Sequence, residues 1–425
     1  MRRRDLLRAV PLLAASPVLS GAATGPRRLM VVFASGGWDS TYCLDPKLGV
    51  VGIEGPEVDS DPGDPQDVEV VETFDGIPIV TNPVRRPAVA TFFGNWARYA
   101  AVVNGIWVGN IAHAPCRQRM LTGRASGVVP DVSVIAGSVL GGDATPLGSV
   151  DASGLGYAGD LAATTGRVGR QSQLALLLDP SSSFPPPFGW DANYPGFLPT
   201  FDDEAAATAF LRRRAEVAEG LRGGGHAMAR MADYGESLNR LERLVPMAAE
   251  IVRELSLGAD PSFATTAGLA MTLFELDVAR SVLLDSNLPW DTHASNVLQH
   301  GYYDSLFGGL NELMASLDER NLLETTTVVV MSEMNRTLRR NRSLGKDHWP
   351  WASALILDKR LNGGRVLGST NDLMEGNAID LASGVEDVLG IPLGYDNFAA
   401  GLLDFLGVDP EPWLEGVPVW RGLSS

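Results

Sequence analysis

The sequence of 425 residues is poor in cysteine, in basic residues and in long apolar runs. Its two cysteines, Cys43 and Cys116, could form one disulfide at most, which excludes a disulfide framework. Only 34 basic residues stand against 51 acidic ones, and the net charge of −17 would repel the phosphates of nucleic acid. Beyond the N-terminal region, no stretch approaches the roughly 18 apolar residues of a membrane helix. We therefore expect no nucleic-acid partner, and no transmembrane segment in the bulk of the chain.

The first 23 residues differ from the rest in charge and pattern. They hold four of the basic residues and one of the acidic ones, which leaves 30 basic against 50 acidic residues and a net charge of −20 for the remainder. Residues 3–8 read RRDLLR, the pattern of a twin-arginine export signal, and an apolar run and a small-residue stretch follow. We expect residues 1–23 to be a signal peptide, the twin-arginine translocase to be a partner during export, and the mature protein to be periplasmic or secreted. The alternative is a basic amphipathic N-terminus on a cytoplasmic protein.

Short apolar runs recur along the remaining chain and are typical of buried strands. They lie at 29–35, 99–103, 132–135, 174–178, 281–284, 325–331 and 354–357. Helical patterns or long loops separate these runs, so we predict an α/β fold over residues 27–425: a three-layer sandwich with a mostly parallel central sheet. Ligand sites in such folds lie beyond the carboxyl ends of the strands.

Two regions interrupt the alternation of strands and helices. Residues 179–199 are rich in Ser, Pro and Gly, which predicts a linker or a surface loop. Residues 202–257 carry an amphipathic helical pattern, and we expect a helical insertion that packs against the sheet domain. Pro246 should kink or break that helix.

Candidate metal ligands follow several of the strand-like runs. Four loops supply them: GGWDST with Asp39, WDTH with Asp291 and His293, SEMNRT with Glu333, and GKDHW with His348. Taken singly, each would be read as a turn or a helix cap. Carboxylates and imidazoles that meet at one sheet edge are the ligands of zinc, manganese or, with fewer histidines, calcium. We therefore expect these five residues to hold one or two divalent ions.

The aspartate next to the last of these ligands also calls for an interpretation. Adjacent residues seldom both bind one ion, so Asp347 is expected to orient His348 rather than to ligate.

A further stretch, AHAPCRQRMLTGR at 112–124, resembles the sulfatase signature, in which a nucleophilic Cys or Ser precedes x-Pro-x-Arg and, further on, Leu-Thr-Gly-Arg. Pro115 and Arg117 fall in register, and His113 occupies the position of the nucleophile. With the four loops above in the same chain order, the sequence is very similar to an uncharacterised, twin-arginine-exported bacterial branch of the alkaline phosphatase and sulfatase superfamily. The resemblance covers roughly residues 29–370 and leaves the helical insertion unmatched. It implies an alkaline-phosphatase-like fold.

Position 113 departs from the family pattern, because a histidine excludes the formylglycine chemistry of true sulfatases. Three interpretations stay open. His113 is a nitrogen nucleophile that forms a phosphoryl-enzyme, or a further metal ligand that leaves water activated by the ion to attack, or part of a site that binds an ion and catalyses nothing. Arg117, one helical turn later, is expected to hold an oxyanion or ester oxygen.

The expected function is that of an exported, metal-dependent hydrolase acting on a small anionic phosphate or sulfate ester. Its acidic surface would repel such a substrate at long range, and bound cations would reverse that sign locally. The alternative is a non-catalytic extracytoplasmic binding or scaffold protein that keeps the fold and an ion. Because Cys43 and Cys116 both flank proposed site segments, a disulfide between them is a further hypothesis.

Overall fold

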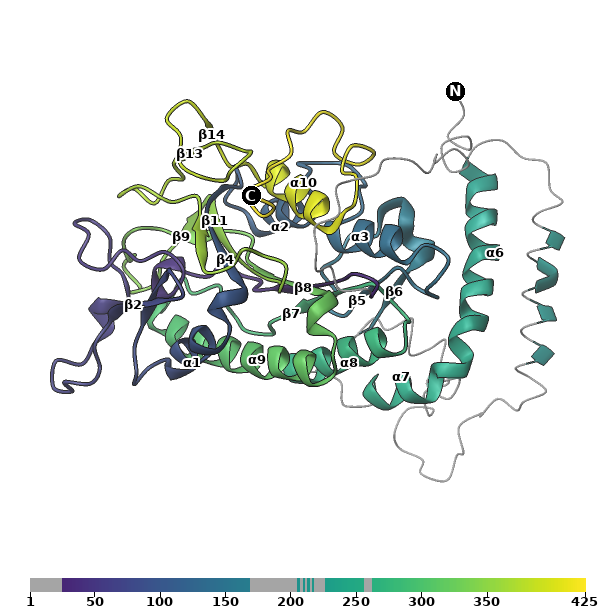
Figure 1. The fold of residues 1–425 in the computed structure, drawn as a ribbon, viewed down its shortest axis with the longest axis horizontal. Coiled ribbons are helices and arrows are strands. Elements are labelled where there is room, and N and C mark those ends of the chain that lie inside the picture. Colours follow the sequence, from purple (N-terminus) through teal and green to yellow (C-terminus); the bar gives the residue numbers. More distant parts are fainter. Residues whose placement is uncertain are drawn as a thin grey trace.

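The computed structural model describes most of the chain after the N-terminal region (Figure 1). The described residues are 25–168, 205–206, 209–210, 212–214, 216–217, 226–255 and 262–425. The predicted signal peptide at 1–23, the apolar run at 174–178 and the predicted loop at 179–199 lie outside them.

The centre of the fold is an eight-stranded sheet with the order β12-β4-β11-β8-β1-β7-β5-β6. Its strands are β1 (Arg28–Phe33), β4 (Ala100–Trp107), β5 (Ser149–Asp151), β6 (Thr165–Arg167), β7 (Ser281–Asp285), β8 (Thr326–Met331), β11 (Trp351–Leu357) and β12 (Arg365–Leu367). Only β11 runs antiparallel to its two neighbours, and every other pair in this sheet is parallel. The predicted α/β fold with a mostly parallel sheet is confirmed.

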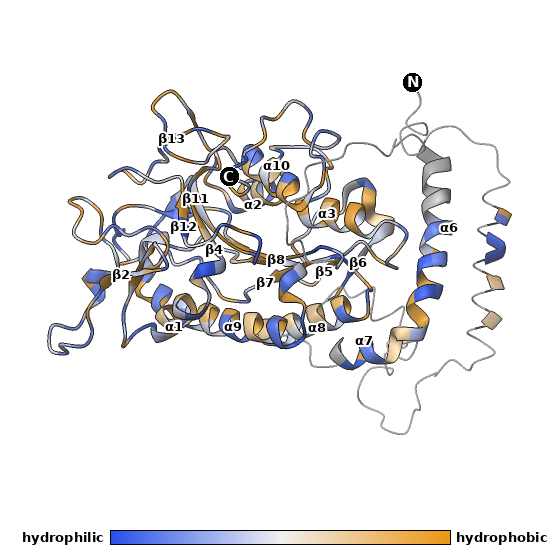
Figure 2. Ribbon diagram, viewed as in Figure 1, coloured by the Kyte–Doolittle hydropathy of each residue, from blue (hydrophilic) through white to orange (hydrophobic). Residues whose placement is uncertain are grey.

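Helices cover both faces of the sheet (Figure 1). One layer contains α1 (Pro87–Trp96), α8 (Phe263–Glu275) and α9 (Gln299–Glu319), and the other α2 (His113–Thr122), α3 (Val132–Gly141) and α10 (Tyr395–Leu406). Successive side chains of a strand point to opposite faces, so Met30 and Val32 pack in the first layer while Leu29 and Val31 pack in the second. The central strands β7 and β8, buried on both sides, are correspondingly hydrophobic (Figure 2). This is the predicted three-layer sandwich.

Three small two-stranded sheets lie outside the central one. They are β2 (Val70–Phe74) with β3 (Ile77–Thr81), β9 (Asn335–Arg336) with β10 (His348–Trp349), and β13 (Ala378–Ile379) with β14 (Ile391–Pro392). Among the described residues, no helix is both long and apolar enough to cross a membrane.

The apolar run at 132–135 is helical, so its prediction as a strand was wrong. It opens α3, whose first turn is capped by Asp131 through a 2.8 Å hydrogen bond from the Val134 amide to Oδ1. A short apolar run cannot be assigned by periodicity when every face of the element is buried. The N-cap aspartate was the signal that distinguishes a helix here.

The described part of the predicted insertion is helical on both sides of Pro246. Helix α6 (His226–Leu244) and helix α7 (Ala248–Leu255) are separated by a single 3-10 turn, Val245–Met247, which contains the proline. Arg240 attaches α6 to the sheet domain by donating to the Pro146 carbonyl at 3.0 Å. The predicted break at Pro246 is therefore confirmed.

The hypothesis of a disulfide between the two cysteines is wrong. Cys43 and Cys116 are both free and fully buried, and they belong to the cores on opposite faces of the sheet. Burial raises the pKa of the Cys116 thiol to about 12, which keeps it protonated and unreactive.

Candidate metal centre

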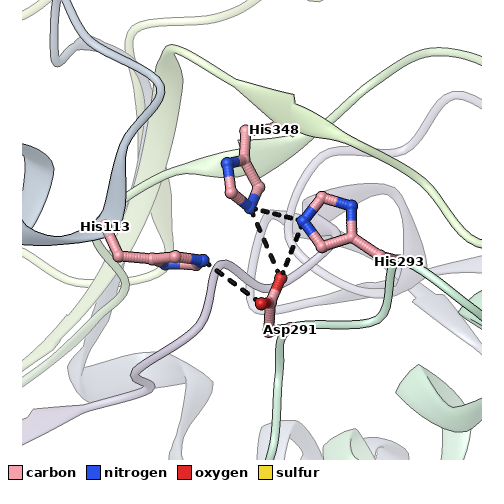
Figure 3. Close-up of side chains that lie close together, drawn as sticks. All are labelled: His113, Asp291, His293 and His348. Atoms are coloured by element: carbon pink, nitrogen blue, oxygen red, sulfur yellow. Dashed lines mark hydrogen bonds and ion pairs between the residues drawn. The ribbon is translucent and has the colours of Figure 1, made fainter.

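Four side chains from three separate segments meet beyond the carboxyl ends of the central strands (Figure 3). His113 is the first residue of α2, Asp291 and His293 lie in the loop after β7, and His348 lies in β10. One ligand atom from each of the four lies within 4.8 Å of the others. The structure thus brings together three of the five predicted ligands, and His113 joins them.

The three histidines of this group are held in the same way, each through its Nδ1 atom. Nδ1 lies 2.9 Å from Glu333 Oε1 in His113, 2.9 Å from Asp347 Oδ1 in His293, and 2.6 Å from the Ile111 carbonyl oxygen in His348. These oxygens only accept hydrogen bonds, so we assign the proton of each ring to Nδ1. In a neutral ring, Nε2 is then left with a free lone pair.

The three Nε2 atoms converge on the carboxylate of Asp291 (Figure 3). Those of His293 and His348 are only 2.8 Å apart, and they lie 3.2 and 3.4 Å from Asp291 Oδ1. His113 Nε2 lies 3.3 Å from Asp291 Oδ2 and has no hydrogen-bond partner among the described residues. Lone pairs that face one another at this distance repel unless a positive charge lies between them. Three imidazole nitrogens and one carboxylate are a donor set that suits zinc.

Asp291 is held by Arg336, a fully buried residue that the sequence interpretation assigned no role. Its guanidinium donates to Asp291 Oδ1 at 2.8 Å, to the Trp290 and Gly37 carbonyls at 2.9 and 2.7 Å, and to the Gly36 carbonyl. Burial alone would raise the pKa of Asp291, but the hydrogen bond and charge of Arg336 outweigh it, and the pKa lies below its usual value. The Asp291 carboxylate is therefore ionised. The only sequence signal for Arg336 was its place in the SEMNRT motif.

Glu333 lies beside the group of four rather than in it. Its buried carboxylate accepts hydrogen bonds from the Gly36 amide at 2.8 Å and from Ser332 Oγ at 3.1 Å, and it faces His113 Nδ1. The hydrogen bond to Glu333 is the main cause that raises the pKa of His113. Glu333, predicted as a metal ligand, thus holds the ring of His113, which was predicted as a nucleophile or an additional ligand.

Asp39, also predicted as a ligand, lies outside the group of four. Its carboxylate caps the 3-10 turn Ser40–Tyr42, accepting from the Thr41 amide at 3.2 Å and from the Thr41 hydroxyl at 2.6 Å. The other oxygen accepts from Asn296 Nδ2 at 2.8 Å and lies 2.7 Å from Lys346 Nζ.

Asp347 does not contact the neighbour that it was expected to orient. It accepts from Asn341 and lies against His293, and these two hydrogen bonds, that of Asn341 first, lower its pKa. His348 instead uses the Ile111 carbonyl, and burial is the main cause that lowers its pKa. The prediction was wrong about the partner because His348 lies in β10, where its ring points toward the start of α2.

Arg117 lies one turn after His113 on α2 and is partly exposed. Its Nε is buried and has no hydrogen-bond partner among the described residues. Its charge acts on Asp285, whose pKa burial raises to about 6. A cavity of about 560 Å³ lies beside Asp347 and is lined also by Arg339, Arg340 and Asp372. None of the four residues of the centre lines this cavity, and its one link to them is Asp347, which contacts His293.

Several solved structures match most of the chain at low sequence identity and low TM-score. A sulfatase from Pseudoalteromonas sp. has a TM-score of 0.38 and 10% identity, covering 91% of this chain and 69% of its own. A protein in the alkaline phosphatase superfamily from Vibrio parahaemolyticus scores 0.36 at 10% identity, with 95% and 71% covered. The phosphonate monoester hydrolase of Agrobacterium radiobacter scores 0.29 at 14% identity, with 93% and 79% covered.

TM-scores below 0.5 do not indicate a shared function. None of the curated proteins compared with the chain matches it. The model of one family, described as a protein of unknown function (DUF1501), matches residues 26–390. Because this match spans most of the sequence, the chain belongs to the DUF1501 family.

Proposed function

We propose that this protein is a metal-dependent hydrolase whose ion is held by His113, Asp291, His293 and His348. One observation carries the proposal: three imidazoles are anchored through Nδ1 to acceptors and turn Nε2 toward one carboxylate. The donor set favours zinc over calcium, because calcium prefers oxygen ligands. A bound divalent ion would supply Lewis acidity and lower the pKa of water.

The residues around the ligands have supporting roles in this proposal. Glu333 and Asp347 hold the rings of His113 and His293 in the tautomer that a cation requires. Arg336 keeps the Asp291 carboxylate ionised and fixes its orientation. For His113, the geometry favours the role of ligand over that of nucleophile, since its free Nε2 faces the same centre as the other two rings.

The substrate class that we propose is a small phosphate or sulfate ester. The side chains of His113, Asp291 and His293 are 34%, 46% and 42% exposed, which favours a centre with a position open to a ligand from solvent. Arg117 is not engaged in any ion pair described in the structure, and a guanidinium can grip two oxygens of such an anion.

A second candidate function is a non-catalytic protein that binds an ion. It is favoured by the number of protein ligands, because four of them already complete a tetrahedral zinc, as in structural zinc sites. The two candidates differ in whether substrate can reach the ion.

The test is hydrolysis of p-nitrophenyl phosphate and p-nitrophenyl sulfate by the zinc-loaded protein, before and after chelation. Hydrolysis that chelation abolishes is expected, and Arg117→Met should lower it at least tenfold while zinc content stays unchanged. Arg98→Met, which alters an exposed arginine on the Tyr99 ring, is the matched control. Zinc binding with no turnover of either ester or of a wider phosphoester panel would favour the second candidate. A protein that binds no divalent ion would overturn both.

Export through the twin-arginine pathway is also part of the proposal. It rests on the RRDLLR sequence at 3–8 and the apolar run after it. In a bacterial host, the full chain should lose its N-terminal segment, and a variant with Arg3→Lys and Arg4→Lys should accumulate uncleaved in the cytoplasm. Equal processing of both proteins, measured by intact mass and cell fractionation, would contradict it.

A further inference from the structure

The predicted ligand Asp39 has no coordination capacity left. An ionised carboxylate offers about four lone-pair positions. Two are taken by the amide and hydroxyl of Thr41 and one by Asn296, and the Lys346 ammonium lies 2.7 Å from Oδ2 as an ion pair without hydrogen-bond geometry. An ion could bind Asp39 only by displacing one of these partners.

Lys346 reaches Asp39 from the loop that also carries His348. Both members of the pair are 0% exposed, so neither can exchange its partner for water. The loop is pressed against the segment of His293: a side-chain carbon added at Gly345 would lie 2.0 Å from the His293 carbonyl oxygen. The Lys346 carbonyl accepts a hydrogen bond from Arg336 at 3.2 Å. The backbone of this loop is therefore fixed beside Arg336 and the His293 segment, and the ammonium is fixed against Asp39.

The charges around the centre balance with one ion. Four carboxylates lie in or beside it: Asp39, Asp291, Glu333 and Asp347. Two buried cations, Arg336 and Lys346, compensate half of this negative charge. With neutral histidines, one divalent ion brings the sum to zero, whereas a second would leave an excess of two positive charges in a partly buried site.

We propose that the centre binds a single divalent ion, and that Lys346, paired with Asp39, supplies the positive charge that a second ion would otherwise bring. The inference rests on the proposed metal centre. In this proposal Lys346 is a positioning residue. Its ammonium neutralises Asp39, which follows strand β1, and thereby holds the loop of His348 near the end of that strand. Glu333 is similarly engaged, since three of its about four lone-pair positions face the Gly36 amide, the Ser332 hydroxyl and His113 Nδ1.

The experiment is zinc titration of the full chain by calorimetry, with zinc per chain measured after desalting. One zinc per chain is expected for the natural sequence. Two zinc ions per chain would overturn the inference and leave the proposed function standing, whereas no zinc at all would overturn the proposed function.

Variants of the pair provide a second, independent readout. Asp39→Asn should keep one zinc with affinity within about threefold, and its Tm should fall by roughly 5–10 °C because Lys346 is left buried and unpaired. The double variant Asp39→Asn with Lys346→Met should melt above Asp39→Asn. Asp291→Asn is the matched control and should weaken zinc binding at least 100-fold. If Asp39→Asn loses its zinc, Asp39 is a metal ligand and the inference is wrong. If Asp39→Asn does not fold, loss of zinc from the double variant leads to the same conclusion.

Discussion

The part of the chain that the structure describes contains two clusters of histidine and carboxylate side chains, and the negative charge of each is balanced in a different way. In the candidate metal centre, the Nδ1 atoms face acceptors, and the Nε2 atoms face one another and Asp291. The second cluster, which we call the buried polar network, consists of Tyr42, Asp59, Glu69, Arg86 and His300. There, His300 Nδ1 lies 2.6 Å from Arg86 Nη1 and Nε2 lies 3.3 Å from Asp59 Oδ2.

The difference lies in the source of positive charge. In the buried polar network, Arg86 is paired with Glu69 and donates to the imidazole, so the cluster contains its own cation and no lone pair faces another. Within the candidate metal centre, the hydrogen bond of Arg336 goes to one oxygen of Asp291, and its other bonds go to backbone carbonyls rather than to the rings. Similar residue types therefore make a closed structural network in one place and a set of free donors in the other.

The largest effect should come from removal of a direct ligand. His348→Ala is expected to weaken zinc binding roughly 1000-fold, about 4 kcal/mol, because one of four donors is lost. His300→Ala, in the buried polar network, should leave zinc affinity unchanged. Competition with a chelating dye measures both. Equal loss in the two variants would erase the distinction between the clusters.

A change of similar size, in stability instead of affinity, is expected from the buried polar network. Arg86→Met leaves Glu69 buried and unpaired and should lower the free energy of unfolding by about 3–5 kcal/mol. Zinc affinity of the folded variant should be unaffected. Arg320→Met is the matched control, since Arg320 pairs with Glu275 and the two side chains are 39% and 40% exposed. Urea unfolding that shows the control to be as costly as Arg86→Met would disprove the expectation.

A smaller effect should follow from the residues that hold the rings. Glu333→Gln removes the charge that fixes His113 and is expected to weaken zinc binding 10- to 100-fold, about 1.4–2.8 kcal/mol. Glu324→Gln, on an exposed ion pair with Lys359, is the control and should bind zinc as the natural protein does. If Glu333→Gln were to abolish binding altogether, Glu333 would be a ligand and the single-ion arrangement would need revision.

The smallest effect concerns pH, and its sign should differ between the clusters. Burial lowers the pKa of His300 in the folded protein, so this imidazole binds a proton more readily in the unfolded chain. His300 therefore lowers the free energy of unfolding as the pH falls below about 6.5. The hydrogen bond to Glu333 raises the pKa of His113, so His113 adds stability to the metal-free protein over the same fall.

Urea unfolding of the metal-free protein at pH 7.5 and 5.5 measures this difference. His300→Gln should lose less stability on acidification than the natural protein, by about 1 kcal/mol or less. His113→Gln should lose more. The same pH dependence in both variants would show that the two rings do not differ in environment.

Much of the fold could be predicted from local pattern. The runs at 29–35, 281–284 and 325–331 are continuous and apolar because those strands are buried on both faces, and they form β1, β7 and β8. The run at 132–135 had the same composition but forms a buried helix, since burial on all sides removes the periodicity that separates the two.

The candidate site could be predicted only in part. Asp291, His293 and His348 were identifiable because motifs after strands reach one edge of a parallel sheet. Lys346 and Arg336 were not, since a lysine or arginine in a loop is ordinarily a solvated charge, and only its partner makes it a site residue.

Composition and apolar pattern were sufficient to predict the fold class and to identify the loops that carry candidate site residues, because strand burial and its periodicity are local properties. The role of each charged residue depended on folding. His113 and Glu333 are 220 residues apart, and neither flanking sequence specifies that one would hold the other. Whether a carboxylate binds an ion or a lysine is determined by which cation the fold brings within hydrogen-bond distance. The fold places Asp39 beside Lys346 and Asp291 beside three imidazoles.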